Sequence, residues 1–164
     1  MVYVVLKLLH VVAVLVFLGN IFTGIFWKWN ADRTRDARII ANALEGIIRS
    51  DRLFTVPGVI VVAVSGVATA MRGHYPILHT GWILWALILF IVSGVAFGIR
   101  VAPLQRSLLA AARAGVSRPH DDDDWWERYD ALSRRWDFWG GFALVTPLVA
   151  MAIMVLKPVL PVLP

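Results

Sequence analysis

The chain has 164 residues, of which 59% are hydrophobic and 16% are charged, and its mean hydropathy is +0.72. A composition this apolar excludes a soluble globular protein and predicts one integral membrane domain over residues 1–164. The absence of cysteine excludes disulfides, thiol redox chemistry and cysteine-ligated metal sites. We attribute the net charge of +5 to basic residues that flank membrane spans, and we expect no nucleic-acid partner.

Four apolar segments follow one another along the chain, at about 2–27, 53–71, 81–99 and 138–156. Each is close to or above the roughly 20 residues that a helix needs to cross a bilayer. The first segment is too long for the hydrophobic region of a signal peptide, so we interpret it as a retained span. The pattern therefore predicts an all-α, four-transmembrane-helix bundle surrounded by lipid.

The basic residues predict the orientation of these spans. Of the 16 lysines and arginines, 13 lie within 28–52 and 100–135, and the others are Lys7, Arg72 and Lys157. Because basic residues concentrate in cytoplasmic loops, both termini are expected on the external side. The sequence thus predicts a multi-pass protein of the bacterial inner membrane.

The two long loops carry amphipathic segments. Apolar residues recur at helical spacing over about Asp32–Ile48, which predicts a surface helix. Ahead of the fourth span, large side chains at Trp125, Tyr129, Leu132, Trp136 and Trp139 form a second stripe, which predicts an interfacial helix lying against the membrane. Between them, His120 and the run Asp121–Asp124 are interpreted as a solvated acidic turn rather than a metal site.

Small residues and prolines predict how the spans pack and bend. Gly94 and Gly98 form a GxxxG pattern, which is expected to mark a helix crossing within the chain or a homodimer contact. Pro103 should bend the continuation of the third span, which we expect to run on to Gly115. Pro147 should kink the fourth span, since it removes a backbone hydrogen bond.

Lys7 and His10 are the ionisable residues within the first span, and their spacing places them on one helical face. We expect Lys7 to extend to the outer interface, which leaves His10 roughly 6 Å deep, one helical turn below it. An ionisable residue inside a span indicates a functional site by default. His10 is therefore the main candidate site residue.

Two other histidines, His74 and His79, lie near the same surface in the short loop before the third span. Haem b is a flat apolar ligand that fits between helices and is held by axial histidines. We expect His10 to ligate the haem iron with His79 or His74 as partner, and Arg72 or Lys7 to pair with the propionates. The alternative is that His10 hydrogen-bonds a neighbouring backbone group or hydroxyl, for example Ser65 or Thr69.

The sequence contains no motif that indicates another kind of catalytic site. The sequence has no zinc-protease HExxH, no nucleophile elbow and no phosphate loop. By position in the sequence, the apolar segments contain no carboxylates, which argues against a proton-coupled relay within the membrane.

Several short motifs carry a resemblance that covers most of the chain. They are Lys7-Leu8-Leu9-His10, Asp51 through Pro57-Gly58, Trp82 at the start of the third span, and Met154 through Pro158. In these the chain resembles an uncharacterised family of predicted integral membrane proteins, domain of unknown function 2269. The first motif, with Gly19 later in the same span, is also similar to the first helix of haem-dependent four-helix protoporphyrinogen oxidases and of copper-resistance D-type membrane domains.

The resemblance to the oxidases implies that His10 binds haem b. Those enzymes also have an essential lysine in the third helix, where this chain has Ala86 by the spacing from Trp82. The resemblance therefore implies a fold and a haem, and it does not transfer the oxidation reaction.

Two functional hypotheses follow, and whether the protein is an enzyme is left open by both. The first is a haem b-binding, redox-active membrane protein with its site near the outer face. The alternative is a non-catalytic scaffold or accessory subunit of a larger membrane complex. Metal handling through histidines and methionines is weaker, because the methionines are scattered.

Overall fold

A computed structural model describes residues 1–117 and 124–162, so the expected acidic turn at His120–Asp123 lies outside the described residues. Within those residues the secondary structure is entirely helical. The elements are α1 (Val2–Asp32), α2 (Ala37–Ser50), η1 (Asp51–Thr55), α3 (Val56–Arg72), η2 (Ile77–His79), α4 (Gly81–Ala96), η3 (Phe97–Val101), α5 (Ala102–Val116) and α6 (Asp124–Leu156).

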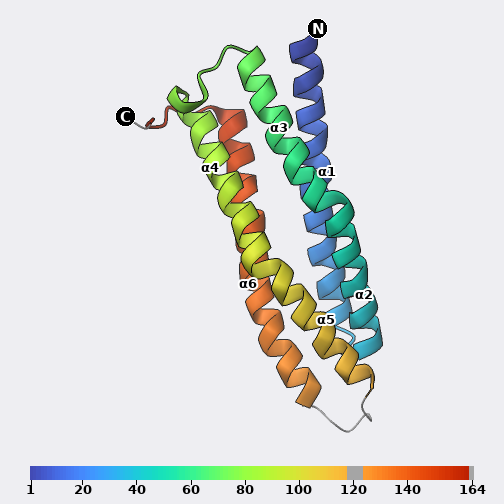
Figure 1. The fold of residues 1–164 in the computed structure, drawn as a ribbon. Coiled ribbons are helices and arrows are strands. Elements are labelled where there is room, and N and C mark those ends of the chain that lie inside the picture. The colour runs from blue at the N-terminus through green and yellow to red at the C-terminus, as the bar shows by residue number, and fades with distance from the viewer. Residues whose placement is uncertain (118–123, 163–164) are drawn as a thin grey trace.

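These elements form four long helices, each apolar and long enough to cross a membrane, at Val2–Asp32, Ala37–Arg72, Gly81–Val116 and Asp124–Leu156. The all-helical, four-span prediction is confirmed. Both termini lie at one end of the molecule together with the α3–α4 connection, and the α1–α2 turn lies at the other (Figure 1). We call these the terminal end and the arginine-rich end.

The helices contain 31 to 36 residues, so they are roughly 46–54 Å long. A bilayer has a hydrocarbon core of about 30 Å, so part of the bundle projects beyond it. Most polar residues of the first span lie toward its C-terminal end, and α2, α5 and the start of α6 lie around that end of the molecule (Figure 1). The projecting part is therefore at the arginine-rich end.

The predicted amphipathic helices are present, and both pack their apolar faces against protein. The segment expected over Asp32–Ile48 is α2, which starts at Ala37 because Asp36 caps it, its Oδ1 accepting hydrogen bonds from the backbone of Arg38 and Ile39. It continues through η1 into α3 instead of lying apart from the span. Its apolar face packs inside the bundle, where Ile40 and Leu44 are 1% exposed.

The predicted interfacial helix before the fourth span is likewise the first part of α6. Tyr129 is fully buried and Trp136 is 3% exposed, so this stripe faces protein and not lipid. The pattern of large apolar side chains was correctly located, but sequence periodicity cannot distinguish a face that covers another helix from one that covers a membrane.

Two π-helical segments interrupt the second and third of the four long helices in the same way. Both η1 and η3 are five residues long, and each is followed by an α-helix that has a proline in its first turn, Pro57 in α3 and Pro103 in α5. A bend was expected at Pro103, and the structure has a π-helical segment immediately before this proline. Single π-turns inside α-helices occur frequently at functional sites.

Pro147 does not interrupt α6, which continues to Leu156. Proline has no N–H, so the carbonyl of Ala143 loses its helical partner. The hydroxyl of Ser93, on α4, donates to that carbonyl at 2.6 Å. A side chain from the neighbouring helix therefore replaces the missing backbone bond, which is how membrane helices tolerate proline.

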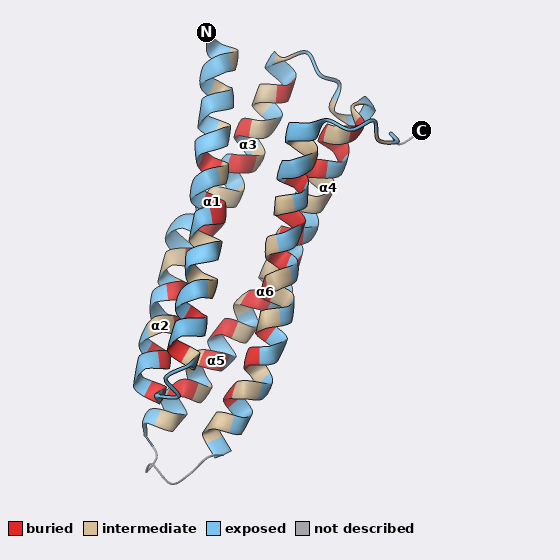
Figure 2. Cartoon of the chain, turned by 180° about the vertical axis from the view of Figure 1, so that it is seen from behind, coloured by how far each residue is buried: buried red, intermediate tan, exposed pale blue. Residues whose placement is uncertain are grey.

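The two halves of the molecule pack differently. Toward the terminal end, α1 packs along α3 and α4 along α6. The first pair forms a small apolar cluster of Ala13, Phe17, Leu18 and Val62, and Phe90, Leu144 and Leu148 of the second pair pack against it. Toward the arginine-rich end, α1, α2, α5 and α6 enclose the larger core. Figure 2 shows this contrast, with the first part of α1 almost wholly exposed.

Candidate functional site

His10 is half-buried at the contact between α1 and α3. Its Nδ1 lies 3.0 Å from the carbonyl oxygen of Val62 and 3.2 Å from the hydroxyl of Ser65. The ring sits close against α3 because Gly66 has no side chain, and a Cβ there would lie 2.9 Å from the His10 Cε1. The expected alternative, a hydrogen bond to a backbone group or to Ser65, is confirmed.

The other residues expected at a haem site are exposed. His74 and His79 lie in the α3–α4 connection, Arg72 ends α3, and Lys7 lies one turn before His10. In the part of the chain that the structure describes, no hydrogen bond or ion pair joins any of them to His10. The structure places these residues at the same end of the molecule, but it does not bring them together around His10.

One feature of His10 fits an axial ligand. Metal-bound histidines usually donate one ring N–H to a carbonyl or carboxylate and ligate through the other nitrogen. The Nδ1 contact with Val62 has this form and leaves Nε2 without a hydrogen bond in the described residues. A second ligand is not equally placed, since Gly66 at the level of His10 lies six residues, or roughly 9 Å, before the end of α3.

A buried carboxylate, Asp51, forms a second site that sequence reasoning missed. Asp51 is 8% exposed, at the start of η1. Its Oδ1 accepts hydrogen bonds from Thr55 Oγ1 at 2.7 Å and from Asn20 Nδ2 at 3.2 Å, and its Oδ2 accepts one from Gln105 Nε2 at 2.8 Å. We call these four residues, contributed by α1, η1 and α5, the Asp51 site.

The Asp51 site lies beside the middle of the apolar helix α1. Asn20 follows Lys7 by 13 residues, so it is roughly 20 Å further along the axis of α1. If Lys7 marks the outer interface, Asn20 remains within the hydrocarbon core of about 30 Å. The prediction that the intramembrane region lacks carboxylates considered the apolar segments alone, whereas Asp51 precedes the apolar run of its own helix and packs beside the middle of α1.

All partners of Asp51 are neutral. Within residues 1–117 and 124–162, no lysine, arginine or histidine makes an ion pair with it. Moving an unpaired carboxylate out of water is costly, and its hydrogen bonds compensate only in part. Such a group is a functional candidate when it lies inside a membrane.

A cavity of about 40 Å³ lies beside the Asp51 site, between the two π-helical segments. Its lining includes all four residues of the site, Ser93 and Trp136, among apolar side chains. The Trp136 Nε1 is buried and has no hydrogen-bond partner in the described residues. A space of this size holds one or a few water molecules, and water could join the indole N–H to the polar groups of the site.

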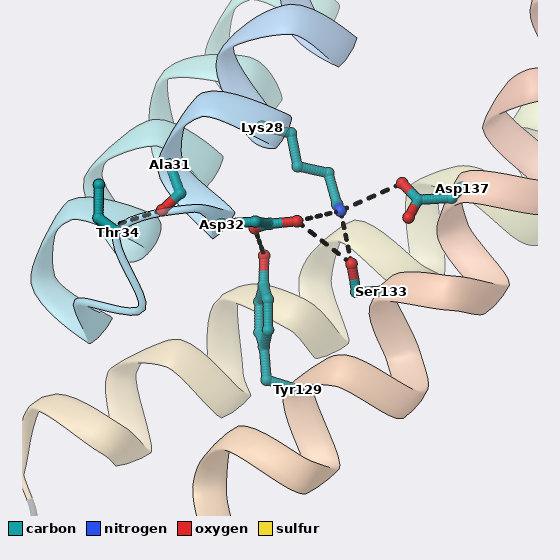
Figure 3. Close-up of polar contacts among 7 residues, drawn as sticks. All are labelled: Lys28, Ala31, Asp32, Thr34, Tyr129, Ser133 and Asp137. Carbon is teal, nitrogen blue, oxygen red and sulfur yellow. Dashed lines mark hydrogen bonds and ion pairs between the residues drawn. The ribbon is translucent and has the colours of Figure 1, made fainter.

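A third polar cluster joins α1 to α6 (Figure 3). Lys28 is 1% exposed, and its Nζ donates to Asp32 Oδ2 at 2.7 Å, Ser133 Oγ at 2.6 Å and Asp137 Oδ1 at 3.2 Å. The Tyr129 hydroxyl donates to the other oxygen of Asp32. We call these five residues the Lys28 network. Every donor of the ammonium is used, so the network serves to hold the two helices together.

Trp136 contacts both the Lys28 network and the cavity beside the Asp51 site. The Lys28 Nζ is 5.0 Å from the centroid of the Trp136 ring, and Trp136 also lines the cavity. A cation over an indole face is attracted by the ring. Trp136 thus lies between a cluster in which carboxylates bind a cation and a site whose carboxylate has neutral partners in the described residues.

Asn20 is the signal that could have revealed the Asp51 site. It is a primary amide in an apolar span, and such a group requires a partner from another helix. Neither Asp51 nor Thr55 could be chosen as that partner from spacing alone, because they lie 31 and 35 residues further along the chain. The packing of α1 against η1 brings them into contact with Asn20.

Comparison with known proteins assigns the chain to a family without assigning it an activity. No curated protein and no solved structure gives a significant match. Residues 4–158 match the family described as "Predicted integral membrane protein (DUF2269)". With its four apolar helices and nearly its full length matched, this chain belongs to the DUF2269 family of integral membrane proteins.

Proposed function

We propose that this membrane protein takes up and releases a proton at Asp51, within the membrane. The observation that carries the proposal is a buried carboxylate at membrane depth whose hydrogen-bond partners are all neutral. Protonation removes the uncompensated charge while the Asn20, Thr55 and Gln105 side chains can remain in contact with the carboxyl group.

The donors around Asp51 favour a proton over a metal ion. Metal cations of the sodium or calcium type require several oxygen ligands directed at one point. Here Asn20 and Gln105 direct N–H groups at the carboxylate, and Thr55 directs its hydroxyl. Among the residues that the structure describes, no group of three or more His, Cys, Asp or Glu side chains could hold a metal.

The surroundings of the site also favour exchange over a fixed structural role. The adjoining cavity can hold water, which carries protons. The site lies where η1 and η3 replace regular α-helix, and π-turns of this kind are common where function requires local irregularity.

Infrared titration of the protein in lipid nanodiscs tests the proposal. A protonated carboxyl group has its own carbonyl stretching band, so acidification should produce a band that Asp51→Asn removes. Glu45→Gln is the matched control, because Glu45 is an exposed carboxylate on the adjoining α2. A set of carboxyl bands that is identical in wild type and Asp51→Asn over the whole accessible pH range would refute the proposal, as would a band that depends on sodium concentration instead of pH.

The second candidate function is haem b binding with redox activity, and the Nδ1 contact between His10 and Val62 favours it. His10 would be an axial ligand, with His79 or His74 as the other after movement of the α3–α4 connection, and Arg72 or Lys7 would contact the propionates. Reduced-minus-oxidised spectra of protein from haem-replete cells test it. A haem spectrum that His10→Ala abolishes and Glu45→Gln, an exposed position on α2, retains supports the assignment, and a cofactor-free wild type rejects it.

The accessory-subunit hypothesis concerns partners and is compatible with a proton site. A Cβ placed at Gly94 or Gly98 would meet no heavy atom within 4 Å among the described residues, so neither glycine supports the expected crossing within the chain. A homodimer contact there remains a prediction. Mild solubilisation from a bacterial inner membrane, with the arginine-rich end expected in the cytoplasm, should retain a partner if the protein is an accessory subunit.

A further inference from the structure

A groove on the surface of the bundle runs between α1 and α2, which lie side by side (Figure 1). Its volume is about 450 Å³, and it is separate from the smaller cavity beside Asp51. Amide and hydroxyl groups occur along its length, contributed by Asn20, Thr23, Asn30, Asn42 and Ser50. A groove with this lining can hold water, whereas a purely apolar one would not.

The groove and the cavity share a common wall. Asn20, Gly24 and Ile47 line both spaces. The Asn20 amide is the polar part of this wall, and it donates to Asp51 and, at 2.9 Å, to Thr55 Oγ1. One side chain therefore touches the carboxylate on one side and the groove on the other.

Mainly apolar side chains bound the cavity in two other directions. Toward the terminal end, Phe17 packs on Phe90 with ring centroids 5.6 Å apart, next to buried Val62. Toward α6, the cavity is lined by the Trp136 ring, whose Nε1 has no partner in the described residues, and Lys28, whose donors are already used, lies over that ring. Among the described residues, neither direction has a row of polar groups like that of the groove.

From this arrangement we infer that protons reach Asp51 from the arginine-rich side, through the α1–α2 groove, and that Asn20 is the positioning residue between groove and site. The inference rests on the proposed proton exchange at Asp51. It adds the route by which the proton reaches Asp51 and the end of the molecule from which it enters. The groove extends from Asn20, in the middle of α1, to Asn30 near the C-terminal end of α1 and Asn42 on α2, so it runs toward the arginine-rich end.

The charged groups on the packing elements leave Asp51 as the titrating group of this route. Arg52 on η1, Arg106 on α5 and Arg100 on η3 are exposed. On α1 and α6, Lys28 and Asp137 are bonded to each other in the Lys28 network. The groove itself is lined by neutral side chains, so its polarity does not change as the pH changes.

A cysteine introduced into this cysteine-free chain can close the groove selectively. Gly46 lines the groove, and a Cβ at this position meets no atom within 4 Å, so Gly46→Cys should fold normally and accept a bulky maleimide. Glu45→Cys is the matched control, since Glu45 is the neighbouring exposed residue and does not line the groove. The measured quantity is the rate at which the Asp51 carboxyl band appears after a rapid drop in pH, identified by subtraction of Asp51→Asn.

We expect the maleimide on Gly46→Cys to slow protonation about tenfold or more, and the same label on Glu45→Cys to leave the rate unchanged. Asn20→Leu should also slow it, with Asn20→Gln closer to wild type. Equal rates for the two labelled variants would overturn the route while the proton site stands. Absence of any Asp51 band in the unlabelled protein would overturn the proton site itself, and the route with it.

Discussion

The two halves of this bundle treat polar groups in opposite ways. In the terminal half, the helices form two loosely connected pairs, and the principal polar contact between helices is that of His10 with Val62 and Ser65. In the arginine-rich half, four helices enclose the Lys28 network and the Asp51 site. Because lipid tails give little hydrophobic drive for helices to associate, packing and polar contacts have to hold a membrane bundle together. The arginine-rich half has more helix packing and more polar contacts between helices, and its four helices enclose a core.

The same comparison separates structural polar groups from functional ones. The Lys28 network pairs a cation with two carboxylates, whereas Asp51 has neutral partners alone within the described residues. A network in which carboxylates bind a buried cation stabilises a fixed arrangement, and a buried carboxylate with neutral partners favours a change of state. We therefore expect mutations in the Lys28 network to affect stability and mutations in the Asp51 site to affect proton binding.

The largest loss of stability is expected for Lys28→Ala. The substitution leaves Asp32 and Asp137 without their cation inside the bundle, and removing one partner of a buried ion pair typically costs about 3–5 kcal/mol. Thermal or denaturant unfolding in detergent should show the loss, and Lys28→Met with Asp32→Asn and Asp137→Asn should recover part of it. A single variant as stable as wild type would show that the network does not hold α1 to α6.

Ser93→Ala should produce the next largest effect. It leaves the carbonyl of Ala143 without a partner, and an unsatisfied buried acceptor costs about 1–3 kcal/mol. The matched test is a double-mutant cycle, because Pro147→Ala restores the backbone N–H that can reach Ala143. Ser93→Ala should then cost little in the Pro147→Ala background, and an equal cost in both backgrounds would contradict the role assigned to this hydroxyl.

In the terminal half, Gly66→Ala should destabilise the contact between α1 and α3 by about 1–2 kcal/mol, since overpacking forces neighbouring groups to shift. Its Cβ would lie 2.9 Å from the His10 ring. Gly19→Ala is the control, because nothing lies within 4 Å of a Cβ at that position. The penalty should disappear when His10 is replaced by alanine, and unfolding curves of the four variants measure it.

Sequence patterns were sufficient for the fold and insufficient for the Asp51 site, for a physical reason. The four spans follow from hydropathy, which is a local property of each segment, and all four are confirmed. The Asp51 site joins Asn20, Asp51 and Gln105 through tertiary packing, and no local pattern encodes that meeting. The alternative considered for His10, a hydrogen bond to a backbone group or to Ser65 or Thr69, includes the contacts with Val62 and Ser65 that the structure shows. Sequence periodicity was insufficient for Tyr129 and Trp136, whose spacing suits lipid and protein equally well.

The smallest effect is expected at the ion pair between Arg113 and Glu45, which also joins two helices of the arginine-rich half. The pair lies 2.8 Å apart, but both side chains are exposed, at 63% and 44%. Water screens such pairs and side-chain entropy opposes them, so their contribution is typically about 0–1 kcal/mol. Arg113→Ala should therefore leave the unfolding midpoint nearly unchanged, and high salt should reduce even that difference. A loss comparable to that of Lys28→Ala would mean that charge pairing in general, and not burial of the pair, holds this half closed. A small loss would identify the buried position of Lys28 as the cause of its importance.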